Sequence, residues 1–249
     1  MKRQHLAVLT FCAAVVFARD AAAQTNPWGN TGYVSLNGLY QSTPITFTTD
    51  TKLNVNQEAG EVRTGHRIAP GPVYDVTAGG KIKGNLGVSY AVSYRRQTEV
   101  ADVSAAVPHP LYYNQPRLVA GAAGLKREDL AMHVAAMWLV PVSETLQVSM
   151  FGGPTYFRVT QDMVRNVEVA ESYPFDEAAY TGVASSSEHA SNLGFNAGAD
   201  VTVFFTRTLG VGGLVRFSQG TVNMPSPDGS TTAVKVGGLQ TGVGLRVRF

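Results

Sequence analysis

The residues of this sequence that could carry out chemistry are few and scattered. Four histidines follow position 23, at His66, His109, His133 and His189, and their spacing is not that of metal ligands. No serine lies in a nucleophile-elbow motif, and no helical pattern follows the glycine-rich segment 210–213, as a phosphate loop would require. The sequence therefore predicts a non-enzymatic protein without cofactor or metal. A catalytic site built from His, Asp and Ser residues of the loops is the alternative.

A second group of polar residues lies at alternate positions within apolar segments. Its members are Asp75, Arg95, His133, Gln147, Asp200, Arg216, Gln240 and Arg246. In strands of a closed sheet, their parity places these side chains on the inner face, where a charge needs a partner. The hairpin registers place Asp75 diagonal to Arg95, and Asp200 diagonal to Arg216, within reach of an arginine. We expect these pairs to stabilise and fill the interior, with His133 as a hydrogen-bonded interior residue. The alternatives are a polar track for small solutes and a proton switch at His133.

The elements that position these residues follow from a hydrophobic period of two. From Leu86 to Arg95, large apolar side chains alternate with mostly small or polar ones, which is the pattern of a strand. The same period predicts eight strands, near 31–41, 72–82, 86–96, 129–140, 145–157, 191–205, 209–219 and 234–249. A buried helix over 130–142 is the rival interpretation of that apolar run. Ten strands are the alternative total, because residues 45–54 either prolong the first strand or pair separately.

The connections between these strands alternate between long and short. They contain 30, 3, 32, 4, 33, 3 and 14 residues, which predicts antiparallel neighbours with short turns on one side and long loops on the other. The 97–128 loop contains three prolines together with Tyr112 and Tyr113. We expect it to fold as a lid over the barrel mouth, the alternative being contact with a partner. The 158–190 loop has a local net charge of −4, which is typical of a solvated loop or, alternatively, of a contact with cations.

The first 23 residues have the layout of a secretory signal peptide. Lys2 and Arg3 precede an apolar run over residues 6–18, and alanines occupy positions 21–23. The mature domain is then 24–249. The single cysteine, Cys12, falls within the signal, so we expect a mature chain without disulfides. Without residues 1–23 the chain has 17 basic and 17 acidic residues, a balance that gives no electrostatic footprint for nucleic acid.

The two faces of the predicted strands indicate which side is inside. Small and polar residues lie opposite the large apolar ones, and they suit the interior of a narrow eight-stranded barrel. The large apolar face then points toward lipid, where backbone closure satisfies every polar group. Outward aromatic residues predict two belts at the lipid–water boundaries, with Trp28, Trp138, Phe205 and Phe249 near the short turns and Tyr40, Tyr74, Tyr94, Tyr156 and Phe217 near the long loops. A soluble lipocalin-like barrel is the alternative and requires the apolar face to turn inward.

The last strand resembles the C-terminal signature of bacterial outer-membrane barrels. A terminal aromatic follows apolar residues at every second position, and the matching residues are Val243, Leu245, Val247 and Phe249. The resemblance implies recognition by the barrel assembly machinery. With the strand rhythm, the mature chain is similar to small eight-stranded barrels of the OmpA and OmpW type.

This resemblance implies a location in the cell outer membrane, in contact with outer-membrane lipid and lipopolysaccharide. The expected fold is an all-β, closed, antiparallel up-and-down transmembrane barrel with long extracellular loops and short periplasmic turns. The expected role is structural or one of surface interaction. The alternative, by similarity to the OmpW family, is a narrow channel or lateral route for small hydrophobic compounds.

Overall fold

The computed structural model describes residues 32–227 and 229–249, all of whose regular elements are strands. The expected signal peptide and Trp28 lie outside these residues. The strands are β1 (Gly32–Gln41), β2 (Ile45–Val55), β3 (Glu58–Ile68), β4 (Gly71–Lys83), β5 (Leu86–Val107), β6 (Arg117–Pro141), β7 (Leu146–Glu171), β8 (Ala178–Phe204), β9 (Leu209–Pro225) and β10 (Thr231–Arg248). Nothing in the described part of the chain forms a helix of the length and apolar character that crossing a membrane by helix requires.

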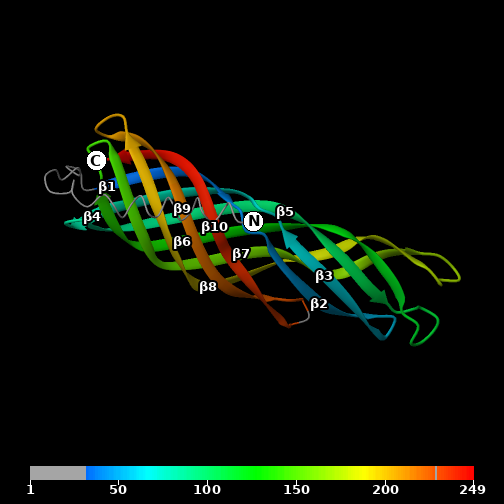
Figure 1. Cartoon of the computed structure of the whole chain (residues 1–249). Helices are drawn as coiled ribbons and strands as arrows, with labels where there is room; N and C mark the ends of the chain where they lie inside the picture. Colours follow the sequence, from blue (N-terminus) through cyan, green and yellow to red (C-terminus); the bar gives the residue numbers. More distant parts are fainter. Residues whose placement is uncertain (1–31, 228) are drawn as a thin grey trace, which may run out of the picture.

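Eight of these strands form a closed antiparallel ring (Figure 1). Its order is β1, β4, β5, β6, β7, β8, β9 and β10, and β10 returns to β1 through a register that runs from Tyr33↔Arg248 to Gln41↔Gln240. The eight-stranded up-and-down barrel predicted from the sequence is confirmed. The helical interpretation of residues 130–142 is wrong, since β6 is a strand to Pro141.

Residues 45–54 pair separately, outside the ring. Strand β2 pairs with β3, and β3 pairs with the outer part of β5 from Glu61↔Ala106 to Gly65↔Asp102. The β2–β3 hairpin is therefore a lateral addition to the long β5, and the ring still contains eight strands.

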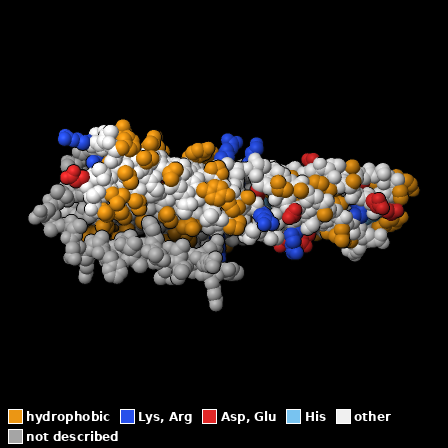
Figure 2. Space-filling view, turned by 45° about the horizontal axis from the view of Figure 1, so that its top comes forward, with side chains coloured by type: hydrophobic (Ala, Val, Ile, Leu, Met, Phe, Trp, Pro, Cys, Tyr) orange, Lys and Arg blue, Asp and Glu red, His pale blue; other side chains and the backbone are white. Residues whose placement is uncertain are grey.

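The lower half of the barrel, which is the half near the short turns, is apolar outside and has an interior that is polar except for two small apolar clusters around Met137 and Leu214. In β5, Leu86, Val88 and Tyr90 are 43–46% exposed, whereas Ser89 and Ser93 between and beyond them are buried. An inward apolar face, as in a lipocalin-like barrel, is therefore wrong for this half. Figure 2 shows the hydrophobic side chains gathered over the wider end of the molecule.

The strands run much further than the sequence pattern suggests. Strands β5 and β6 remain paired from Leu86↔Trp138 to Val107↔Arg117, and β7 and β8 remain paired as far as Glu171↔Ala178. The expected loops at 97–128 and 158–190 are thus wrong over most of their length. The connections that remain between these strands are residues 108–116 and 172–177.

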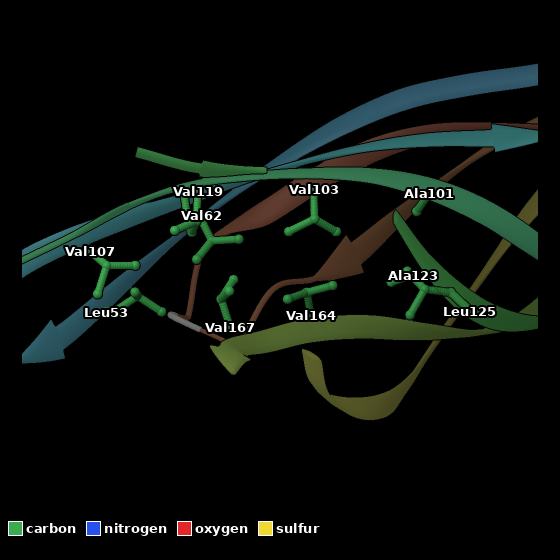
Figure 3. Close-up of a cluster of buried hydrophobic side chains, with 11 residues drawn as sticks. Leu53, Val62, Ala101, Val103, Val107, Val119, Ala123, Leu125, Val164 and Val167 are labelled. Atoms are coloured by element: carbon green, nitrogen blue, oxygen red, sulfur yellow. The ribbon is translucent and has the colours of Figure 1, made fainter. Parts of the chain in front are cut away.

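The strand extensions and the β2–β3 hairpin together form a second part of the structure, which we call the extended half. Its faces are reversed relative to the lower half, so that its interior is apolar. Side chains from β2, β3, β5, β6 and β7 converge on one buried cluster (Figure 3), which we call the outer core. It consists of Leu53, Val62, Ala101, Val103, Ala105, Val107, Val119, Ala123, Leu125, Val164 and Val167. Because this interior is apolar and the outward residues Asp102, Ser104 and Lys126 are exposed, this half has the burial pattern of a water-soluble β structure.

Candidate functional site

Asp75 lies at the centre of a hydrogen-bond network in the lower barrel. Its carboxylate accepts from Asn37 Nδ2 at 2.7 Å, Ser93 Oγ at 2.7 Å and Arg216 Nη1 at 2.6 Å. Thr77 Oγ1 adds a fourth hydrogen bond at 2.9 Å. The side chains of Asp75 and Arg216 are 0% and 3% exposed. Four donors, one of them the cation Arg216, replace the water that this carboxylate loses on burial.

His133 continues this network across the barrel. Its Nε2 lies 3.2 Å from Ser93 Oγ and its Nδ1 lies 2.8 Å from Thr155 Oγ1, which accepts from Asn196 Nδ2 at 2.9 Å. The one hydroxyl proton of Ser93 is donated to Asp75, so Nε2 of His133 is assigned as a donor to Ser93 and Nδ1 as an acceptor from Thr155. His133 is therefore a hydrogen-bonded residue of the barrel interior.

The ion pairs expected from the sequence are wrong, although the registers behind them hold. Asp75 lies opposite Ser93 and Asp200 lies opposite Leu214. However, Arg216 pairs with Asp75, from a strand three places away in the order β4, β1, β10, β9. Asp200 pairs instead with Arg246, which also donates to Asn37 Oδ1. In a barrel this narrow, an arginine reaches across the lumen as easily as to a diagonal neighbour.

The remaining inward residues are distributed along the lumen. Arg95 donates to the Ala69 carbonyl and, at 2.5 Å, to Gln97 Oε1. Gln240 Nε2 lies 3.4 Å from Gln41 Oε1, and Gln147 lines the lower cavity. Of the eight residues predicted to point inward, six are buried and two, Gln147 and Asp200, are half-buried.

The lumen contains little empty space. The lower cavity, lined by His133, Asp200, Arg216 and Arg246 among others, measures about 30 Å³, which is room for about one or two water molecules. Above the polar network lies an apolar layer, which we call the plug, with fully buried side chains at its centre. It consists of Ile45, Ile68, Ala131, Phe157, Val159, Met163, Val222, Met224, Val234 and Val236.

A buried row of a hydroxyl, an imidazole and a carboxylate lies beside the plug. Thr49 Oγ1 is 3.1 Å from His66 Nε2, and His66 Nδ1 is 2.6 Å from Glu99 Oε1. Hydrolytic triads use the same order of groups. Here, however, the side chains of His66 and Glu99 are 0% exposed and Thr49 is 3% exposed, so no substrate can reach the hydroxyl. This row could not be predicted from the sequence pattern, because its three residues lie in segments expected to be the first and second long loops.

The far end of the extended half consists of the β2–β3 turn, residues 108–116 and residues 172–177, and we call it the distal tip. Here three hairpins contact one another. Asn56 of the β2–β3 turn donates to the Pro108 carbonyl at 3.2 Å, and the Asn114 amide donates to Glu58 Oε1 at 2.8 Å. Arg117, which is buried, pairs with Glu171 at the end of β7. These contacts fix the β5–β6 connection between its neighbours.

Large side chains at the distal tip point into solvent. Leu111, Tyr112, Tyr113 and Tyr173 are 53–81% exposed. The expectation that Tyr112 and Tyr113 fold as a lid is wrong, because the interior is already filled by the outer core and the plug. These three tyrosines and Leu111 are instead exposed on a hydrogen-bonded frame.

The acidic residues of the 158–190 segment are divided among several contacts. Glu171 pairs with Arg117, and Glu188 pairs with Arg165 at 3.4 Å. Asp162 accepts from Ser187 Oγ at 2.9 Å. Within residues 32–227 and 229–249, no three His, Cys, Asp or Glu side chains come together as a metal site.

The outside of the lower barrel is a continuous apolar band bordered by aromatic residues. All predicted girdle residues that the structure describes are exposed, namely Tyr40, Tyr74, Tyr94, Trp138, Tyr156, Phe205, Phe217 and Phe249. The signature residues Val243, Leu245 and Val247 also point outward and are 41–69% exposed. Water does not favour such a surface, but the hydrocarbon of a membrane does. The closed ring, polar lumen and apolar band together define a transmembrane β-barrel of the bacterial outer-membrane class.

No family model and no curated protein matches this sequence. Among solved structures, the outer membrane protein OprG from Pseudomonas aeruginosa is similar at a TM-score of 0.48 and 11% identity, over 88% of this chain and 97% of that chain. Neisserial surface protein A is similar at a TM-score of 0.44 and 10% identity, over 88% and 97%. Ail, the attachment invasion locus protein of Yersinia pestis, is similar at a TM-score of 0.37 and 10% identity, over 88% and 99%.

Proposed function

We propose that this chain is a non-conducting barrel of the outer membrane whose role is surface interaction through the distal tip. The observation that carries this proposal is the contrast between a filled lumen and an exposed, fixed tip. The polar network and the plug occupy the interior, while Tyr112, Tyr113 and Tyr173 are presented to solvent by three linked hairpins. Among barrel types, we infer kinship with the small eight-stranded OmpA and OmpW type.

Planar-bilayer recordings test the non-conducting role. We expect the purified, folded barrel to give no discrete current steps, because a cavity of about 30 Å³ below an apolar plug offers ions no continuous hydrated path. Reproducible steps of a fixed size would instead support the alternative, a narrow channel for small compounds. A known porin reconstituted in the same bilayers serves as the positive control.

The distal tip suits recognition for two physical reasons. Tyrosine offers a large contact area with few rotatable bonds, so little conformational entropy is lost when it is bound. The tip is also held by hydrogen bonds between hairpins, which lowers the ordering penalty of binding. Carboxylates of Glu58 and Glu171 lie beside the aromatic residues and already accept hydrogen bonds.

Cysteine labelling tests the proposed orientation, because the mature chain is expected to contain no cysteine of its own. We expect Tyr113→Cys, at the exposed tip, to react with a membrane-impermeant maleimide on intact cells. Lys83→Cys, at the opposite short-turn end, should react only after the outer membrane is permeabilised. Labelling of Lys83→Cys on intact cells, with Tyr113→Cys protected, would mean that the barrel is inserted the other way round.

For biogenesis, we propose that the barrel assembly machinery reads the outward residues Val243, Leu245, Val247 and Phe249. Their side chains are accessible along the last strand, and the backbones of Phe249 and Gly32 exchange two hydrogen bonds of 2.9 Å where that strand closes the ring. Other proposed contacts are outer-membrane lipid and lipopolysaccharide. The balanced charge argues for no nucleic-acid partner.

A further inference from the structure

A row of cations crosses the outer wall of the barrel where its apolar band ends. Arg96 on β5, Lys126 on β6 and Arg158 on β7 all point outward and are exposed. Arg96 and Arg158 each lie two residues beyond an outward tyrosine of the band, Tyr94 and Tyr156. Strands β5 and β7, on either side of β6, thus repeat the same order, in which an aromatic residue is followed on the same face by an arginine.

The strand registers bring these cations close together. Arg96 lies opposite Glu128, and Arg158 lies opposite Leu130, so Arg158 is diagonal to Glu128 on the same face. From strand spacing and rise, the Cα atoms of Arg96 and Arg158 are about 12 Å apart. Two arginine side chains can therefore converge on one headgroup.

The acids near the row leave most of its charge unpaired. Glu128 is 3.2 Å from Arg96 Nε, and Asp162, further from the band, accepts from the Lys126 backbone amide and from Ser187. Within the described residues, Arg158 has no ion-pair partner and neither does the Lys126 side chain.

A fourth cation extends the row onto the lateral hairpin. Arg67 on β3 is exposed and lies two residues from Gly65, which pairs with Asp102 of β5. We call Arg67, Arg96, Lys126 and Arg158 the basic row.

The basic row lies at the level of the barrel wall where the apolar side chains change from pointing outward to pointing inward. Below it the apolar side chains point outward, as at Tyr90 and Tyr94, and above it they point inward, as at Ala101 and Val103. In Figure 2, Lys and Arg side chains gather between the wide end, rich in hydrophobic residues, and the narrow end. With the distal tip outside the cell, as proposed above, this is the level of the headgroups of the outer leaflet.

We propose that the basic row binds the phosphate groups of phosphorylated lipids in the outer leaflet. The inference rests on the proposed orientation, with the distal tip outside the cell. Arginine matches phosphate because its planar guanidinium donates two parallel hydrogen bonds. Tyr94 and Tyr156 below the arginines face the boundary between headgroup and acyl chains, a position that amphipathic rings favour. Phosphate and hydrocarbon of one lipid are thus contacted on a single face.

Lipid retention in nanodiscs tests this proposal. The full mature barrel is placed in phosphatidylcholine discs that contain a small fraction of diphosphorylated lipid A, and bound lipid is counted by native mass spectrometry. We expect the double variant Arg96→Gln/Arg158→Gln to retain lipid A about tenfold less well than the wild type, because two charge-assisted hydrogen-bonding groups are lost. The matched control, Arg63→Gln/Arg165→Gln, removes two exposed arginines further from the band and should bind as the wild type does.

Two further measurements show whether the protein recognises the phosphate group and whether that phosphate must belong to a lipid. Dephosphorylated lipid A should be retained by the wild type as weakly as lipid A is by the double variant, and free glucosamine phosphate should not compete with lipid A. Equal retention of both lipids, or of lipid A by both double variants, would overturn the proposal. Effective competition by the free sugar phosphate would overturn the commitment to a membrane lipid.

Folding and orientation are measured separately from lipid binding. Heat-modifiable migration in gels shows that each variant is folded, and the cysteine labelling described above reports orientation. If a correctly inserted barrel retains lipid A independently of its phosphate groups, phosphate binding by the basic row is refuted but the proposed function is not. A reversed orientation refutes the proposed function as well.

Discussion

Replacement of Asp75 by alanine is expected to lower the free energy of unfolding of the barrel by about 3–5 kcal/mol. The change leaves the guanidinium of Arg216, whose side chain is 3% exposed, without the carboxylate that lies 2.6 Å from it. It also removes the acceptor of Asn37, Thr77 and Ser93. A buried cation without a partner is more destabilising than the loss of the pair itself, because its desolvation is no longer offset.

Urea unfolding in detergent micelles measures this loss. The control is Asp50→Ala, which breaks the ion pair between Asp50 and Arg63, 2.8 Å apart and exposed to solvent. Because solvent screens that pair, its removal should barely shift the unfolding midpoint. If Asp75→Ala unfolds at the same urea concentration as Asp50→Ala, the lumen network does not stabilise the fold.

Replacement of Val62 by aspartate is expected to release the extended half while leaving the barrel intact. Val62 is 0% exposed and lies between Thr51 of β2 and Ala105 of β5 in the registers. A carboxylate in the outer core has no partner there, and its burial destabilises the packed extended half by on the order of 3 kcal/mol. The β2–β3 hairpin should then detach from β5.

Limited trypsin digestion of the folded protein reports this detachment. In Val62→Asp we expect rapid cleavage after Lys52 and Arg63. The membrane-embedded strands should stay protected from trypsin, and the gel migration of the barrel should still change on heating. Thr48→Asp adds the same charge on the exposed face of β2 and should resist trypsin as the wild type does. Equal resistance of both variants would show that the outer core does not hold the hairpin in place.

Strand identity and register could be predicted because they depend on local alternation. The period of two located all eight ring strands, and tight turns at residues 83–85 and 206–208 fixed Asp75 opposite Ser93 and Asp200 opposite Leu214. The ion-pair partners could not be predicted in this way. They depend on which side chains meet across the lumen, and hairpin register describes only adjacent strands.

The long extensions of the strands were missed for a different reason, a change of face. In β5 the large residues occupy even positions up to Tyr94, and the buried apolar residues occupy odd positions from Ala101. A search for one continuous outward apolar face therefore ends near 96. The switch in parity was present in the sequence as Ala101, Val103, Ala105 and Val107. It marks the level at which the solvent outside the barrel changes from lipid to water.

The pairing of the first ring strand with the last has a consequence for how the protein reaches its folded state. Strand β1 exchanges hydrogen bonds with β4 on one side and with β10 on the other, so its second edge has no partner until the end of the chain has been delivered. Contacts this distant in sequence form slowly, because the loop entropy must be lost first. Until β10 arrives, the free edge of β1 has unpaired backbone groups that could pair with strands of other chains. Closure of the ring must therefore wait until the last strand of the chain has arrived.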